Sequence, residues 1–593
     1  MEQSSKYIYD FTFADYYIMI GYLVLLISVG FILKKKVSNV KDYYIGGNNI
    51  PWWMAGASCF MMSFSAWTFT GAAGFAYNNG IVIILLFLFN VIAFIFCAFF
   101  VAAKCRQTRK ISYLEIVRSR FGRATEQFFL WIQVPTMLFG GAIWLVGLAT
   151  FVSVAFGIPI QVTIVISGIV VLIYSTLSGS WGIMTADFLH SLVLLVLSIV
   201  ISILTLIKIG GLQDFVTKVD PEKLKLFSEQ HNVIWVVAYF FQIFLIFNSI
   251  QYAPRFLAVK DGLSARKAAL TAALLFFIGP IIWFFPPIAA TYLFPDIGKI
   301  VPQLSHPQDA AYVLIGLEVL PKGLAGLLIM MIFVATLSSM DAAINQNAAL
   351  ISMNLYKPLF RPKASEREQF NAARIINILL GFCVIVLASF FAKQKEFALF
   401  DLMLFLLASI GLPVAVPFVL IYWVKKTSRN AAIISTLGGI LFSFLTEHYI
   451  FFSNKESCII CEYLRFFGIN SFDLHYEWPF ALRVFGTIGV STALFFVTRF
   501  VWKKNSEEYQ QKVDEFYNIM NKPIDVDKES SGSGAMQHFM IVGILSLVAG
   551  VGILVLLFFT NRWLDRFAIL LTGLMIFMAG LVMLLIARYK KAH

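Results

Sequence analysis

Apolar stretches of about 20 residues, separated by short polar ones, run along the whole chain, and each is long enough to cross a membrane as a helix. The pattern predicts an all-α polytopic membrane protein. The fifteen predicted spans are 13–33, 52–76, 80–103, 127–156, 159–178, 182–207, 233–254, 268–294, 322–355, 374–392, 398–424, 430–450, 478–501, 538–560 and 566–587.

The distribution of charged residues predicts how the chain is oriented in the membrane. The net charge of +13 could indicate nucleic-acid binding, but it is spread over the loops, so membrane topology explains it better. If the N-terminus is outside, 32 of the 46 lysines and arginines fall on the inner side. The positive-inside rule therefore favours an odd number of spans, N-out and C-in. Because no N-x-[ST] acceptor occurs, we expect a prokaryotic source and the bacterial inner membrane as the plasma membrane concerned.

The polar segments are too short to contain a soluble catalytic domain. Residues 503–537 predict an inside linker, amphipathic in its first half and flexible in its second. The chain contains neither a P-loop nor an H-E-x-x-H motif, which argues against an ATP-driven pump and an intramembrane metalloprotease. We expect no enzymatic activity and no organic cofactor.

The ninth span carries the most informative polar residues. Ser338, Asp341 and Asn345 recur at helical spacing and form one stripe, with Ser339 beside it. A carboxylate at membrane depth is costly unless it faces a cavity, a partner or an ion. We interpret Asp341 as facing a cation or a proton route. Asp187, early in the sixth span, has a simpler reading as a helix N-terminal carboxylate stabilised by the dipole.

Two other spans have polar centres. Ser63, Ser65 and Thr68 lie among glycines in the second span, and Gln242 and Asn248 lie in the seventh. Small and polar residues can simply allow close helix packing. They can also mark an unwound midpoint that lines a binding site in a transporter. These residues alone leave both readings open.

Four segments together resemble the sodium/solute symporter family, which includes sodium/glucose, sodium/proline and sodium/sialic acid cotransporters. They read KDYYIGGNNIPWWMAGAS, SGSWGIMTADFLHSL, NSIQYAPRFLAVKD and ATLSSMDAAINQNAALISMNLYKP. The resemblance covers about residues 10–430. It implies a LeuT-type core of two five-helix inverted repeats, formed by spans 2–6 and 7–11.

This core divides the chain into six segments. Residues 1–45 hold the leading helix and first inside loop, and 46–210 and 211–428 hold the two repeats. Spans 12 and 13 follow in 429–502, then the 503–537 linker, and 538–593 holds the last two spans.

The resemblance also implies ion-binding residues. The family's main sodium site corresponds to the backbone carbonyls of Met61, Phe64 and Ala335 and the hydroxyls of Ser338 and Ser339. Oxygen ligands of this kind suit a hard cation.

Some members of the family bind a second sodium through an aspartate that matches Asp187 and two hydroxyl residues that match Asp341 and Ala342. This chain departs from that pattern, since one hydroxyl has become a carboxylate and the other is lost. A second cation, a proton and a structural Asp341 all remain open.

The solute residues carry over less completely. The sialic acid branch holds a carboxylate with hydroxyls that match Ser63, Ser65 and Thr68, but its arginine on the fourth span has no counterpart here. The glutamine of the sugar branch is replaced by Thr68. Trp67 and Gln242 complete the expected pocket.

We therefore expect a sodium-coupled secondary active symporter that imports a small polar organic solute, such as a sugar or sugar acid. Its partners would be that solute, sodium ions and membrane lipid, with no nucleic acid. A proton-coupled symporter of the same fold is one alternative. A transporter-like receptor is disfavoured because the linker and tail are short, and a channel because no charged selectivity ring is evident.

Overall fold

The computed structural model describes residues 9–34, 45–175, 180–393, 398–451, 477–500, 506–529 and 535–592. All regular secondary structure in these ranges is helical. The principal helices are α1 (Phe13–Lys34), α3 (Trp52–Met61), α4 (Ala66–Phe69), α5 (Gly71–Asn79), α6 (Val82–Phe96), α7 (Ala102–Gln107), α8 (Tyr113–Phe121), α9 (Arg123–Phe156), α10 (Ile160–Ser175), α11 (Ser180–Ile209), α13 (Val233–Phe247), α14 (Ala253–Leu257), α15 (Gly262–Leu293), α17 (Ala311–Val319), α18 (Leu324–Ile351), α19 (Glu366–Phe391), α20 (Leu399–Leu406), α21 (Leu412–Leu420), α22 (Ala431–Phe451), α24 (Glu477–Val497), α25 (Glu507–Asn521), α26 (Val526–Glu529), α27 (Ala535–Leu554) and α28 (Trp563–Ala592).

Every predicted span coincides with one or more of these helices. Within the described part of the chain, ten helices are long and apolar enough to cross a membrane, and four shorter apolar helices accompany them. The chain is thus a multi-pass helical protein. The count of fifteen spans and their orientation stay predictions.

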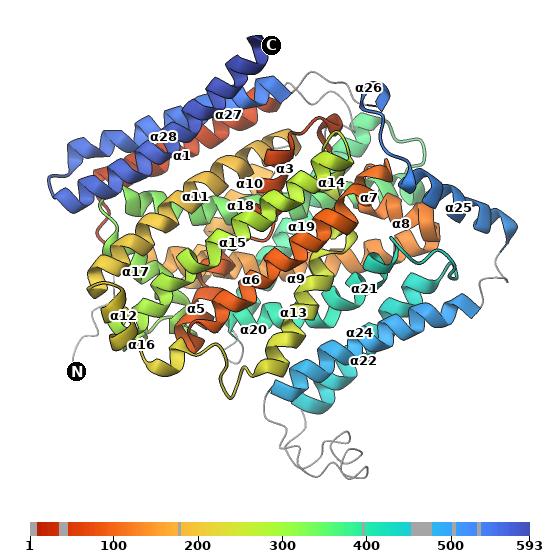
Figure 1. The fold of residues 1–593 in the computed structure, drawn as a ribbon, viewed down its shortest axis with the longest axis horizontal. Coiled ribbons are helices and arrows are strands. Elements are labelled where there is room, and N and C mark those ends of the chain that lie inside the picture. The colour runs from red at the N-terminus through yellow and green to blue at the C-terminus, as the bar shows by residue number, and fades with distance from the viewer. Residues whose placement is uncertain are drawn as a thin grey trace.

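The helices form a broad bundle with a helix group at each end (Figure 1). In the figure α1, α27 and α28 run together along one edge, and α22 pairs with α24 at the opposite edge. The α27–α28 pair is held close by glycines, since a Cβ on Gly550 would lie 2.9 Å from the carbonyl oxygen of Gly573. Such close backbone approach is how apolar helices associate without a hydrophobic driving force.

Two of the helical stretches are broken near their middles. The second span is interrupted between Met61, where α3 ends, and Ala66, where α4 begins. The seventh is interrupted between Phe247 and Ala253, the end of α13 and the start of α14. The two breaks face each other, because the hydroxyls of Ser63 and Tyr252 lie 2.9 Å apart. This settles the question that the polar residues of these spans left open: both helices are broken.

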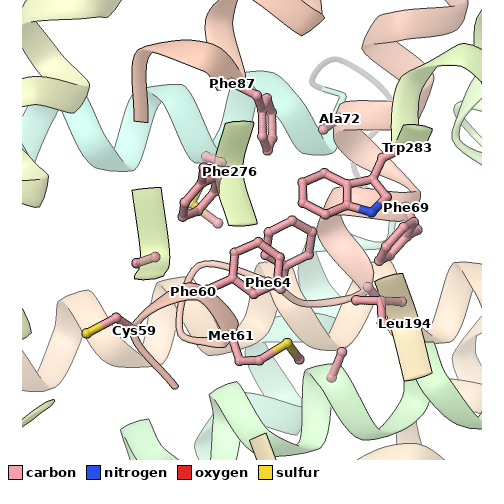
Figure 2. Close-up of a cluster of buried hydrophobic side chains, with 14 of the residues drawn as sticks. Cys59, Phe60, Met61, Phe64, Phe69, Ala72, Phe87, Leu194, Phe276 and Trp283 are labelled. Carbon is pink, nitrogen blue, oxygen red and sulfur yellow. The ribbon is translucent and has the colours of Figure 1, made fainter. Parts of the chain in front are cut away.

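Aromatic packing fixes the first break in place (Figure 2). The ring of Phe64 meets the rings of Phe60 and Trp283 with centroids 4.5 and 4.4 Å away, and Phe276 packs edge-on against Phe60. All four residues are buried. Because Phe60 at the end of α3 and Phe64 within the break are both anchored in this cluster, the backbone between them is held in a defined position.

The leading helix is tied to the start of α18 by one carboxylate. Asp15 is fully buried and accepts hydrogen bonds from the backbone N–H groups of Gly323 and Gly326, at 2.7 and 3.1 Å. Its other oxygen accepts from the backbone and hydroxyl of Thr12. Asp15 therefore supplies acceptors for N–H groups that a helix start leaves unpaired, and it joins α1 to α18.

Candidate functional site

The candidate ion site forms where the broken second span meets α18. Ser339 lies on α18 with its hydroxyl 2.5 Å from the carbonyl oxygen of Phe64, 3.5 Å from that of Met61 and 3.2 Å from that of Ala335. Met61 ends α3, and its carbonyl oxygen also accepts from the backbone N–H of Phe64 within the break, at 3.0 Å. Four of the five residues expected for the main sodium site thus meet around one hydroxyl.

Ser338, the fifth residue, is directed toward a carboxylate instead. Its hydroxyl donates to Asp187, which also accepts a hydrogen bond of 2.5 Å from Ser58 on α3. Asp187 is 1% exposed, and a guanidinium nitrogen of Arg255 lies 3.9 Å from it. The main site and Asp187 are therefore joined through the adjacent serines on α18.

Asp187 does not sit at a helix N-terminus. It lies two turns into α11, and its hydrogen bonds go to side chains rather than to the first N–H groups of the helix. The dipole explanation is therefore wrong. The buried carboxylate is stabilised by two hydroxyls and by the nearby charge of Arg255.

Asp341, the partner expected for Asp187, has its backbone in α18. Its side chain and that of Ala342 lie outside the described residues. Whether Asp341 meets a cation, a proton or a hydrogen-bond donor stays an open prediction.

Two of the expected solute residues are engaged in local structure. The hydroxyl of Ser65 caps α4 by accepting from the backbone N–H of Trp67, at 3.2 Å. The hydroxyl of Ser63 pairs with Tyr252 across the two helix breaks. Both serines therefore lie at the break, where the Ser65 oxygen accepts from backbone and the Ser63 hydroxyl bonds another side chain.

Trp67 faces the start of α20. Its indole N–H donates to the carbonyl oxygen of Leu399, at 2.9 Å, and its ring stacks on Phe400 with a centroid distance of 5.8 Å. Phe400 also stacks on Phe75, at 4.1 Å. These three rings form a layer between the second span and α20, so Trp67 belongs to this layer.

Thr68, Gln242 and Asn90 are among the buried polar side chains that have unused hydrogen-bonding capacity within the described structure. The Thr68 hydroxyl and both amide atoms of Gln242 have no partner, and neither does the Oδ1 atom of Asn90. Rings of Phe89 and Phe240 meet at 5.1 Å, so Asn90 on α6 and Gln242 on α13 lie at a similar depth. Buried polar groups normally find partners, so the unpaired atoms of these side chains are available to a polar ligand.

Several residues of the site were not anticipated from the sequence. Thr336 accepts from the backbone N–H of Ala66 at 2.7 Å and so joins α18 to the start of α4. Ser58, Tyr252 and Asn90 are the others. A small hydroxyl residue one helical turn before the break was the only signal for Ser58, and nothing in the pattern singles out Tyr252 or Asn90.

Two broken helices whose breaks meet in the middle of a membrane protein, beside hydroxyls and helix-end carbonyls, define a secondary transporter. A model of the sodium:solute symporter family matches residues 43–439, more than half of the chain. The chain therefore belongs to the sodium:solute symporter family.

Individual relatives support this placement. The chain is similar to the sodium/sialic acid symporter SiaT of Proteus mirabilis, with 25% identity over 457 residues, covering 73% of this chain and 89% of the relative. It is similar to the human sodium/myo-inositol cotransporter 2, with 25% identity over 475 residues, covering 72% and 68% of the two chains. These relatives are transporters, so the chain is a transporter and not an enzyme.

One solved structure shows the same fold. It is the substrate-bound outward-open state of a Na⁺-coupled sialic acid symporter, which matches with a TM-score of 0.65 and 20% identity. The match covers 82% of this chain and 98% of that one. At this identity the likeness speaks for the fold alone, which is LeuT-like.

Proposed function

We propose that this chain is a sodium-coupled symporter that imports a small polar organic solute across the plasma membrane, in bacteria the inner membrane. Its main sodium site consists of the carbonyls of Met61, Phe64 and Ala335 and the hydroxyls of Ser338 and Ser339. The observation that carries this proposal is the convergence of the three carbonyls on the Ser339 hydroxyl, within 3.5 Å.

The chemistry of these ligands fits a monovalent cation. Neutral carbonyl and hydroxyl oxygens suit a hard ion without requiring a second negative charge. Bound between them, sodium would take over the bridging role that the hydroxyl proton of Ser339 has in the structure. Because the carbonyls lie on the broken second span and the hydroxyls on α18, such an ion would hold the two elements together.

We propose a second cation between Asp187 and Asp341, sodium more readily than a proton. Asp187 is a buried carboxylate joined to the main site through Ser338. Arg255 offsets part of its charge, so the additional negative charge of Asp341 is what favours a second cation. Loss of Asp341 should then change the stoichiometry and leave the main site intact.

We propose that the solute occupies the region of Thr68, Gln242 and Asn90. Their free groups are a hydroxyl, an amide and an amide oxygen, which are neutral donors and acceptors. Such groups suit a polyhydroxylated solute such as a sugar or sugar acid. The relatives named for sialic acid and myo-inositol carry solutes of this general kind.

Transport would follow the alternating-access scheme of two inverted repeats. In the first half of the core a broken helix (α3–α5) is followed by α6–α7, α9, α10 and α11, and in the second half α13–α14 is followed by α15, α18, α19 and α20–α21. This repeated order supports the 5+5 arrangement. Sodium moving inward would supply about 2.3 kcal/mol per charge for each 100 mV of membrane potential.

A thermal-shift screen tests the proposal. Purified protein is heated with sugars, sugar acids, amino acids or vitamins, each in sodium and in potassium chloride. A ligand that binds the folded state raises the midpoint, so sodium alone should raise it and a transported solute should raise it further only when sodium is present. Equal midpoints in sodium and potassium for every solute would contradict sodium coupling.

A further inference from the structure

An amphipathic helix from outside the family-matched region docks against the helical core. The family model ends at residue 439, whereas α25 spans Glu507–Asn521. One face of α25 is buried through Val513, Phe516, Tyr517 and Met520, and the opposite face is exposed. In Figure 1 α25 lies at the edge of the bundle beside α7 and α8.

Arg109, in the turn between α7 and α8, forms hydrogen bonds with the last turn of α25 and with the segment that follows it. Its guanidinium makes a two-pronged contact with the Glu529 carboxylate, at 2.8 and 3.0 Å. It also donates to the carbonyl oxygens of Ile519, Lys522 and Pro523. The hydrogen bond from Arg109 holds the pKa of Glu529 below its usual range, so the carboxylate is charged at neutral pH.

Arg109 also takes up a costly backbone conformation. Its φ of 60° lies in the left-handed region, which residues other than glycine seldom adopt. Arg109 directly follows Thr108, the C-cap of α7, and its backbone N–H donates to the carbonyl oxygen of Arg106 at 3.2 Å, an arrangement common where helices end.

Arg120, at the end of α8, forms a second set of hydrogen bonds that involve α25. It is fully buried, and its guanidinium donates to the hydroxyl of Tyr509 at 2.7 Å and to the carbonyl oxygen of Lys425 at 2.7 Å. Tyr517 of α25 donates to the carbonyl oxygens of Ile421 and Val424, at 2.8 and 2.9 Å. The helix therefore contacts the α7–α8 corner and the end of α21 at the same time.

An exposed ion pair completes the link to α21. Lys425, just after that helix, lies 2.6 Å from Asp514 of α25. The α7–α8 corner follows the second span of the first repeat, and residues 421–427 follow the last span of the second. A helix bound to both connects the two halves, whose relative motion gives alternating access.

We propose that residues 507–529 form a cytoplasmic clasp that stabilises the inside-closed state of the transporter and must loosen before the solute leaves. The proposal rests on the proposed sodium-coupled function and orientation. Under that function, sodium at the α3–α18 site would favour the outward-facing, inside-closed state, and the clasp would stabilise the same state. By linkage, loosening the clasp must then weaken sodium binding by the factor by which sodium tightens the clasp.

Hydrogen–deuterium exchange on the purified full-length protein tests the clasp, with sodium chloride as the probe and potassium chloride as reference. Sodium should slow amide exchange in 507–521 at least threefold, together with protection of peptides covering 60–68 and 335–345. Unprotected site peptides would reject the sodium site itself. Protected site peptides with unchanged exchange in 507–521 would reject the clasp alone.

Variants supply the second arm of the test. Glu529→Gln removes the charge that Arg109 holds and should raise both the exchange of 507–521 and the half-saturating sodium concentration about threefold. Glu515→Gln is the matched control, because Glu515 is exposed on the same helix and takes no part in these contacts. If Glu529→Gln frees α25 but leaves the half-saturating sodium concentration equal to that of the control, the clasp is uncoupled from transport and the proposal is wrong.

Discussion

Removing one hydroxyl, in Ser339→Ala, should weaken sodium binding severely while sparing the fold. The Ser339 hydroxyl is within 3.5 Å of three carbonyl oxygens, and its distance to the Phe64 oxygen is 2.5 Å. A buried polar contact to a charged group is worth about 1.5–3 kcal/mol. Since about 1.4 kcal/mol is a tenfold change, the half-saturating sodium concentration should rise roughly tenfold to a hundredfold.

The assay is a sodium titration of the thermal midpoint, with ionic strength held constant by potassium chloride. Ser28→Ala is the matched control, because the Ser28 hydroxyl also bonds the carbonyl four residues earlier, that of Val24 on α1, but lies in no site. The midpoint of both variants without sodium should stay close to that of the wild type. A half-saturating sodium concentration in Ser339→Ala within twofold of the control would refute the site.

Four other changes test neighbouring parts of the protein. Thr68→Val should cost about 1–3 kcal/mol of solute affinity by leaving a solute group unpaired, and an affinity within twofold of wild type in a binding titration would remove Thr68 from the pocket. Asp341→Asn should lower the sodium Hill coefficient of transport toward one, whereas an unchanged coefficient with a lost pH dependence would indicate a proton. Asp15→Ala leaves the N–H groups of Gly323 and Gly326 unpaired and should destabilise the protein by about 2–4 kcal/mol in unfolding by SDS; a loss below about 0.5 kcal/mol would contradict the cap. Because its pKa is lowered in the folded protein, ionised Glu529 stabilises the fold fully above the ordinary glutamate pKa of about 4.3, and this stabilisation is lost as pH falls through the lower folded pKa. The thermal midpoints of wild type and Glu529→Gln should therefore differ at pH 7 and converge in acid. A difference that stays constant with pH would contradict the ion pair.

The membrane-spanning pattern was predictable because burial in lipid requires long apolar segments. Each predicted span has a helical counterpart, and the amphipathic first half of the 503–537 linker is the helix α25. Local polarity at Ser63 and Thr68 singled out the second span but left close packing and a broken helix equally open. The grouping of Ser339 with Met61 and Phe64 came from the family resemblance.

Local sequence patterns do not predict contacts between segments that are far apart in the chain. Ser63 and Tyr252 are 189 positions apart, and Ser58 and Asp187 are 129 positions apart. The role of Ser65 as a helix cap depends on where the backbone breaks, which composition does not specify. The sequence pattern assigns Arg109 only as a positive charge on the inner side, although its guanidinium binds a segment more than 400 residues away.

Sodium flux in proteoliposomes decides whether solute and ion move together. The protein is reconstituted, and uptake of sodium-22 is followed with and without each solute that raises the thermal midpoint. Sodium coupling predicts that the solute accelerates sodium-22 entry and that an inward sodium gradient concentrates the labelled solute inside. Solute accumulation that persists in potassium and collapses when a protonophore is added would contradict sodium coupling.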